Sequence, residues 1–308
     1  MKASEKEQKT ETKRRIFIFG MFTLIFLFIL GAVYIRCRET IVLLLLMLTP
    51  GLSALAARLL TGEGKKDAFI RPYFRRNKGW YVAIWIITPF LAFMGAAFYF
   101  LVFPKDFQPL SSLCAQDSGS KTIAEYIGYL AATLPLAVLV NPVMGLVQCL
   151  GEEAGWRGYL LPKLLDFMEP WKAVLLTGVI WGAWHAPVIA CGFNYGTGHP
   201  VAGIGAMVLF CTVLGFIQGW LFFRTGTVWS CVVFHAALNG MDLFSPSMLF
   251  TDGQVNPFLG PDPTGILGGI FLIGLAAAAL WDNIRLSDVV SEESLAIADD
   301  AENIFDHP

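Results

Sequence analysis

Six side chains able to take part in chemistry lie within stretches of this sequence that are otherwise apolar. They are two glutamates, an arginine, two histidines and an asparagine: Glu152, Glu153, Arg157, His185, His235 and Asn239. An ionisable side chain inside a lipid bilayer costs several kcal/mol, so each one there is a functional hypothesis by default. A carboxylate and an imidazole can share a water molecule, with the carboxylate taking its proton as general base. The same two groups are also ligands for Zn²⁺.

Helical spacing gives the two adjacent glutamates different surroundings. Residues four apart lie on one helix face, so Glu153 and Arg157 can neutralise each other as a buried ion pair. Glu152 is rotated from this pair by about 100°, and its neighbours on its own face are Gln148 and Asn141. We therefore predict that Glu152 is free for chemistry and that Glu153 and Arg157 form a structural pair. The alternative is that both glutamates are solvated at the membrane surface.

The histidines are ambiguous when each is taken alone. His185 follows Trp181 by one helical turn, and a lone histidine in a membrane helix can be a hydrogen-bonded packing residue. His235 and Asn239 are one turn apart on one face, but asparagine is also a common packing residue between membrane helices. No His-Glu-x-x-His sequence is present, so the spacing does not require a metal.

Composition places the chain in a membrane. Of its 308 residues, 56% are hydrophobic and 15% are charged, whereas soluble domains carry roughly 25% charged residues. We predict an all-α, polytopic membrane protein of about eight transmembrane helices, each close to the roughly 20 residues that cross the hydrocarbon core. The expected spans are 16–35, 41–60, 80–103, 124–150, 170–193, 201–223, 227–250 and 266–281.

The chain reads as one transmembrane domain at 16–281 between a cytoplasmic N-terminal segment at 1–15 and an acidic cytoplasmic tail at 282–308. The apolar run at 16–35 is too long for a signal peptide and has no clear cleavage site after it, so we expect it to remain as the first span. Lysine and arginine are concentrated before the first span and after the second, fourth and sixth. The positive-inside rule therefore predicts that both termini are cytoplasmic.

Net charge and cysteine content bear on possible partners and on disulfide or metal sites. The net charge of −2 gives no indication of a nucleic-acid partner. Six cysteines occur without Cys-x-x-Cys spacing, mostly in or near apolar segments. We expect them to be small apolar packing residues, not disulfides or metal ligands.

The segment 123–163 is the least regular part of the pattern. If fully helical, its roughly forty residues extend about 60 Å, twice the thickness of the hydrocarbon core. Pro135 and Pro142 must kink such a helix. Two short spans joined at Asn141 and Pro142 would need a very tight turn and would invert the topology of everything that follows. One long, kinked helix is therefore the prediction.

The candidate residues lie at similar depths. Each is eleven to thirteen residues from a basic residue that marks a cytoplasmic helix end; the pairs are Glu152 with Lys163, His235 with Arg224, and His185 with Lys172. At about 1.5 Å per residue these separations are about 16, 16 and 20 Å. If each helix turns its polar face inward, the groups converge in one polar catalytic cavity in the second half of the chain, open toward the cytoplasm.

The three elements resemble the signature of the CPBP family, the CAAX-protease and bacteriocin-processing enzymes that include the type II CAAX prenyl endopeptidases. The family pattern has two acidic residues and an arginine, then an aromatic residue and a histidine one turn apart, then a histidine and an asparagine one turn apart. Here it reads Glu152-Glu153-Ala154-Gly155-Trp156-Arg157, Trp181-Gly182-Ala183-Trp184-His185 and His235-Ala236-Ala237-Leu238-Asn239. The resemblance covers about residues 124–245. Trp181 stands where the family often has phenylalanine.

The resemblance implies intramembrane hydrolysis of a peptide bond by a glutamate-activated water. Carried over to this chain, Glu152 and His185 activate the water, while His235 and Asn239 stabilise the oxyanion. No cofactor is required for this chemistry, but zinc is possible; if a metal is present, its expected ligands are Glu152, His185 and His235.

The implied substrate is a peptide or protein in or near the bilayer, and the sequence does not distinguish a prenylated C-terminal peptide from a leader peptide or another membrane protein. The alternative from another class is a proton-coupled transporter or a non-catalytic membrane scaffold, because buried Glu and His also serve proton relays. Confinement of the polar groups to the second half of the chain favours the enzyme, since transporters often carry corresponding features in both halves.

Overall fold

The computed structural model describes residues 2–64 and 67–285, which form helices and connecting turns without a β-strand. The all-α class predicted from composition is confirmed. The described residues include five helices long and apolar enough to cross a membrane: Lys6–Cys37, Thr40–Thr61, Phe74–Val102, Ile123–Leu164 and Pro200–Thr225. The chain is thus a multi-pass membrane protein. The predicted acidic tail at 282–308 lies almost wholly outside the described residues.

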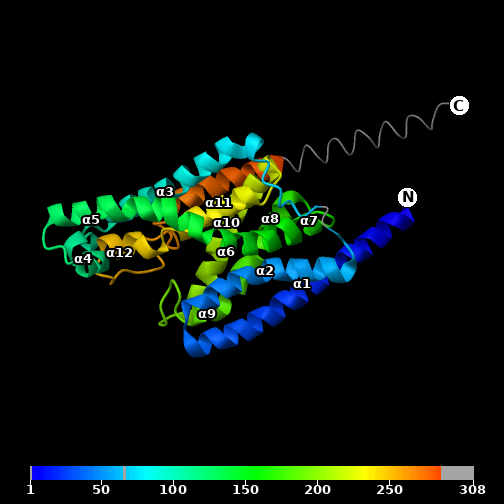
Figure 1. Cartoon of the computed structure of the whole chain (residues 1–308), viewed down its shortest axis with the longest axis horizontal. Helices are drawn as coiled ribbons and strands as arrows, with labels where there is room; N and C mark the ends of the chain where they lie inside the picture. The colour runs from blue at the N-terminus through cyan, green and yellow to red at the C-terminus, as the bar shows by residue number, and fades with distance from the viewer. Residues whose placement is uncertain (1, 65–66, 286–308) are drawn as a thin grey trace.

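The long helices extend along the longest axis of the molecule (Figure 1). They are α1 (Lys2–Cys37), α2 (Thr40–Thr61), α3 (Phe74–Val102) and α10 (Pro200–Thr225). The shorter elements are η1 (Pro104–Asp106), η2 (Pro109–Ser111), α4 (Leu113–Ser118), α8 (Pro170–Trp184), α9 (Ala186–Ala190), α11 (Trp229–Asn239), η5 (Asp242–Phe244) and α12 (Pro246–Phe250). A further helix covers 270–285.

Three of the eight expected spans are shorter or interrupted helices. The span expected at 170–193 is divided into α8 and α9 at His185, and that at 227–250 is divided after Asn239. Pro187 has no amide hydrogen to donate to the preceding turn, which explains why α8 does not continue. The span expected at 266–281 corresponds to the helix at 270–285. Within residues 2–64 and 67–285, five helices meet the length and hydropathy of a span, and the count of eight stays a prediction.

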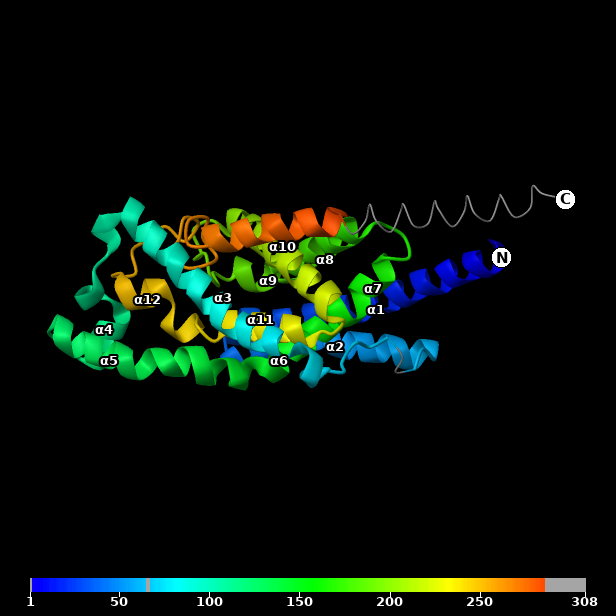
Figure 2. The same ribbon diagram turned by 90° about the horizontal axis from the view of Figure 1, so that it is seen from above.

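Residues Ile123–Leu164 form one continuous helical segment of 42 residues, as expected. It consists of α5 (Ile123–Pro135), the π-helical turn η3 (Leu136–Val140), α6 (Asn141–Gly155), a second π-helical turn η4 (Trp156–Leu160) and α7 (Leu161–Leu164). At about 1.5 Å per residue it is about 63 Å long. Its first part extends beyond α1 and α2, where α4 and α12 lie beside α5 (Figure 2).

Glycines allow close contact between the helices that carry the candidate residues. A Cβ added at Gly151, next to Glu152, would lie 2.7 Å from the Cα of Leu48 on α2. A Cβ added at Gly182 on α8 would lie 2.4 Å from the Cα of Val208 on α10. Membrane helices commonly use small residues for such approaches. These two contacts set the positions of α6 and α8.

An ionic cluster joins α1 and α7 to the C-terminal end of α2. Glu63, just after α2, forms an ion pair with Lys163 of α7, and Arg58 and Arg15 lie 3.8 Å and 3.9 Å from its carboxylate. Burial alone would raise the pKa of Glu63, but the three cations outweigh it and hold the pKa below its ordinary value. The cluster therefore ties α1 and α2 to the helical segment that carries the two central glutamates.

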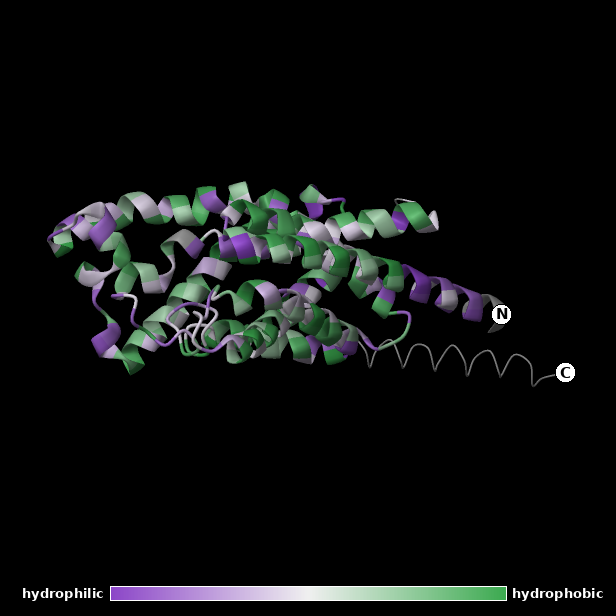
Figure 3. Ribbon diagram, turned by 90° about the horizontal axis from the view of Figure 1, so that it is seen from below, coloured by the Kyte–Doolittle hydropathy of each residue, from purple (hydrophilic) through white to green (hydrophobic). Residues whose placement is uncertain are grey.

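The exterior of the long helices is apolar. Hydrophobic residues dominate them, while a hydrophilic stretch occupies the N-terminal end of α1 (Figure 3). On α1, Phe17 and Phe28 are 72% and 81% exposed. Large apolar patches of this kind mark contact with a membrane or another protein. All six cysteines are free, and Cys114, Cys149, Cys211 and Cys231 are buried.

Candidate active site

Glu153 lies at the centre of a buried ionic cluster. Arg157, one turn along the same helical segment, donates from Nη1 to both carboxylate oxygens at 3.1 Å and 2.9 Å. Gln218 of α10 donates from Nε2 to Oε1 at 2.9 Å. Nδ1 of His235 on α11 lies 2.9 Å from the same oxygen. Because a carboxylate can only accept, His235 donates from Nδ1, and its Nε2 is left for another group.

Glu152 is equally buried but has a different partner. Its Oε2 accepts a hydrogen bond of 2.6 Å from Nε1 of Trp181 on α8. Among the described residues, no cation forms an ion pair with this carboxylate, whereas Glu153 has Arg157. The two neighbouring carboxylates therefore differ in kind: a guanidinium compensates one, and a neutral indole N–H orients the other.

The Trp181 ring contacts residues around both carboxylates. The guanidinium carbon of Arg157 lies 4.4 Å from the centroid of the ring, within the range of a cation–π contact. The His235 ring meets it in a T-shaped arrangement at 5.4 Å. The side chain is 2% exposed. One aromatic residue thus contacts groups from α6, η4 and α11.

His185 is held at the junction of α8 and α9 by its own helix. Its Nδ1 lies 2.9 Å from the carbonyl oxygen of Trp181, one turn earlier. A carbonyl only accepts, so Nδ1 carries the hydrogen and Nε2 is the basic nitrogen. Cys211 of α10 lies 3.8 Å from Nδ1, and the Trp184 ring lies 4.9 Å from the imidazole. The half-buried imidazole is therefore fixed in tautomer and in orientation.

Asn239 is not hydrogen-bonded to this cluster. It is the last residue of α11, one turn beyond His235, and is half-buried. Its side chain forms no hydrogen bond within the described parts of the chain. Asn141, by contrast, donates from Nδ2 to the carbonyl of Gly240 at 3.0 Å and so links α6 to the end of α11. The Asn239 amide remains available to another group.

Sequence spacing missed one residue of the site, Gln218, and one contact, that between Trp181 and Glu152. Gln218 is fully buried in an apolar helix, and an amide in a membrane helix is a signal that could have placed it in the site. The hydrogen bond from Trp181 to Glu152 joins two residues that are 29 positions apart in sequence and lie on different helices. Periodicity within one helix cannot reveal a contact of this kind.

The described residues contain no group of three or more His, Cys, Asp and Glu side chains that could hold a metal ion. Nδ1 of His185 is engaged by a carbonyl and Nδ1 of His235 by Glu153. Among the described residues no hydrogen bond engages Nε2 of either ring, and the ligand set considered for zinc, Glu152 with the two histidines, stays a prediction.

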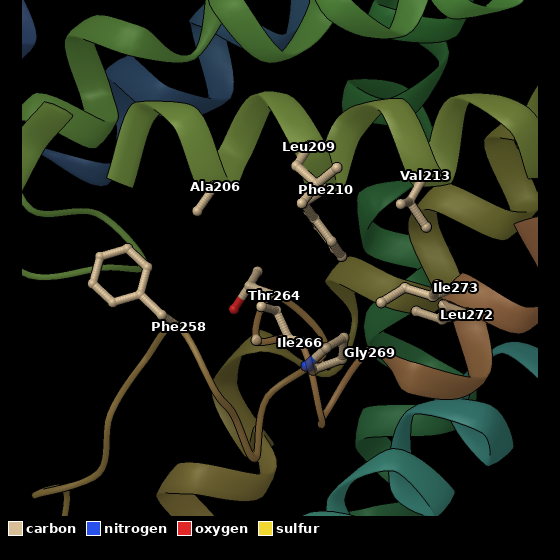
Figure 4. Close-up of a pocket in the computed structure, with 12 residues that line it drawn as sticks. Ala206, Leu209, Phe210, Val213, Phe258, Thr264, Ile266, Gly269, Leu272 and Ile273 are labelled. Atoms are coloured by element: carbon tan, nitrogen blue, oxygen red, sulfur yellow. The ribbon is translucent and has the colours of Figure 1, made fainter. Parts of the chain in front are cut away.

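A cavity of about 90 Å³ lies between α10 and the segment 258–273 (Figure 4). Its lining is almost entirely apolar, with Leu209, Phe210 and Ile273 among the residues that face it. None of the candidate catalytic residues lines it. It is also smaller than the roughly 300–1,000 Å³ of most small-molecule sites. The polar cavity expected around Glu152 stays a prediction.

Comparison with known proteins identifies the same region. Residues 133–241 match the family model described as type II CAAX prenyl endopeptidase Rce1-like. A stretch of 44 residues, 14% of this chain, is 41% identical to CAAX prenyl protease 2 of Methanococcus maripaludis and covers 16% of that protein. The chain thus matches about a sixth of the length of this relative. The family match contains every candidate residue from Glu152 to Asn239, so the region 133–241 that carries the site is similar to the Rce1-like type II CAAX prenyl endopeptidases.

Proposed function

We propose that this protein is an intramembrane endopeptidase in which Glu152 is the general base. The Rce1-like domain and the multi-pass helical architecture support a peptidase that acts on proteins or peptides at the membrane. The observation that carries the assignment to Glu152 is the difference between the adjacent carboxylates. Glu153 is occupied by Arg157, Gln218 and His235, while within the described part of the chain Glu152 is bonded only to the Trp181 N–H.

Charge balance indicates where the protons lie. Two carboxylates and one guanidinium leave one negative charge without compensation in apolar surroundings, which is costly. One further proton, on His235 or on Glu152, removes this charge. In the reactive form the proton is on His235, so that Glu152 is an ionised base and the imidazolium carries hydrogen on both nitrogens.

The proposed reaction uses each of these groups. Glu152 accepts a proton from water while the water oxygen bonds to the peptide carbonyl carbon, and Nε2 of His185 accepts a hydrogen bond from the same water. The carbonyl oxygen becomes an oxyanion, stabilised by Nε2–H of His235 and the amide of Asn239. Glu152 then gives its proton to the amine nitrogen as the carbon–nitrogen bond breaks. The substrate is a protein or peptide associated with the bilayer, such as a prenylated protein or a leader peptide.

The test is cleavage of fluorogenic prenylated and leader-type peptides by the purified protein in liposomes. Glu152→Gln keeps an acceptor for the Trp181 N–H but cannot take a proton, so activity should fall by about 10²-fold or more. Glu125→Gln, an exposed glutamate near the other end of the same helical segment, is the matched control and should retain activity. Full activity in Glu152→Gln would overturn the mechanism. Activity lost on chelation and restored by Zn²⁺ would replace it with a metal-dependent one.

A further inference from the structure

Trp181 contacts four of the polar residues in the site. Its indole N–H donates to Glu152, and its ring lies against the guanidinium of Arg157. The ring also meets the His235 imidazole of α11, and the backbone carbonyl accepts from His185, one turn later. The side chain lies in the interior, so no part of this arrangement depends on the surface. No other donor is bonded to Glu152 among the described residues.

We propose that Trp181 is a positioning residue whose indole N–H orients Glu152 for catalysis, an inference that rests on the proposed role of Glu152 as the base. The N–H engages Oε2 at 2.6 Å and so fixes the plane of the carboxylate. Oε1, which accepts no hydrogen bond among the described residues, is then the oxygen left to accept the proton of the water. Phenylalanine has no such hydrogen, so the tryptophan supplies a contact that an aromatic ring alone does not.

A neutral donor suits this position better than a cation. A guanidinium at Glu152 would stabilise its ionised form and weaken it as a proton acceptor. The indole N–H fixes the geometry without adding charge. Glu153, which has no proposed proton-transfer role, receives the cation instead. The pairing of each carboxylate with its donor therefore matches its proposed role.

Trp181 also contributes to the site through its backbone carbonyl, and a change of side chain leaves this contribution intact. Its carbonyl accepts the hydrogen of His185 Nδ1 at 2.9 Å, and every amino acid at 181 keeps that carbonyl. A change of side chain therefore tests the N–H while the tautomer of His185 is preserved. Phenylalanine also keeps an aromatic face for Arg157 and His235.

The experiment measures kcat and KM for peptide cleavage by two variants at position 181. Trp181→Phe removes the N–H, and replacement by 3-benzothienylalanine keeps the bicyclic shape but has sulfur in place of N–H. Both should lower kcat by about 10- to 100-fold, the loss expected for one hydrogen bond to a charged group. KM should be unchanged, because the substrate contacts remain. The thermal unfolding midpoint should fall more for Trp181→Phe, which leaves a cavity at a buried position, than for 3-benzothienylalanine, which fills the same space.

The matched control is Trp220→Phe. Trp220 also donates its indole N–H to a carboxylate, that of Asp282, at 2.8 Å, but it lies outside the candidate site. Its kcat should stay close to that of the unmodified protein. A similar loss in both tryptophan variants would overturn the proposal, because it would reflect the general removal of an indole.

Three further results overturn the proposal. They are full kcat in Trp181→Phe, a kcat restored by 3-benzothienylalanine, and a kcat that is unchanged in both variants once it is corrected for the folded fraction of the protein. If Glu152→Gln is inactive while Trp181→Phe is fully active, the positioning role fails and the proposed function stands. If Glu152→Gln is itself active, the proposed function fails.

Discussion

Adjacent glutamates in one helix acquire opposite electrostatic surroundings in this protein. A one-residue offset rotates a side chain by about 100° around the helix. Glu153 consequently contacts Gln218 of α10 and His235 of α11, whereas Glu152 contacts Trp181 of α8. The difference between them comes from the neighbouring helices and not from the residues beside them in sequence.

The ion pair of Glu153 gives a stability prediction. Arg157→Met removes the guanidinium and leaves a fully buried carboxylate without its strongest partner. Breaking a buried pair in this way should destabilise the protein by about 3–5 kcal/mol. Thermal unfolding in detergent measures the loss, with Arg75→Met, at an exposed arginine of α3, as the control. Equal unfolding midpoints for the two variants would contradict a supporting role for Arg157.

Sequence spacing is informative at this scale only within one helix. Glu153 and Arg157 are four residues apart, and the structure contains the ion pair that this spacing predicts. The contacts of Glu152 with Trp181 and of Glu153 with His235 join different helices. They depend on helix rotation and packing distance, which no periodicity in a single sequence specifies.

The contact between α8 and α10 positions two site residues at once. A Cβ at Gly182 would lie 2.4 Å from Val208, so Gly182→Val must displace α8 together with Trp181 and His185. Overpacking of this kind costs about 1–3 kcal/mol, and we expect peptide cleavage to fall with it.

The control for this change is Gly205→Val on α10. A Cβ at Gly205 meets nothing within 4 Å, so the added side chain enters open space. Initial rates of cleavage and unfolding midpoints should separate the two variants. Equal activity in both would show that the close approach of α8 and α10 does not position the site.

At the scale of elements, the long helix was predictable and the interrupted helices were not. The very tight turn that two short spans would need, and the inverted topology that they would impose, predicted one helix over 123–163, and Ile123–Leu164 is continuous. Apolarity also suggested continuous spans through His185 and Asn239, where the chain instead leaves the helix. Departures from local regularity are expected where residues serve function.

At the scale of the whole molecule, composition predicted an all-α membrane protein, but the side facing the cytoplasm is a separate proposal from lysine and arginine content. Cys37, the last residue of α1, provides a test because it is exposed. A membrane-impermeant maleimide should label it in right-side-out vesicles, and Cys37→Ser should remove that signal. Labelling confined to inverted vesicles would place the N-terminus outside.

The two π-helical turns have a consequence for comparing this chain with its relatives. A π turn is a local wide turn that accommodates an additional residue, and such turns lie on both sides of the 15 residues of α6. One added residue rotates everything beyond it by about 100°. An alignment gap of one residue at 136–140 or 156–160 would therefore leave Glu152 in place relative to α2 and α8. The same deletion within 141–151 would bring Glu153 into its position and exchange the base for its ion-paired neighbour.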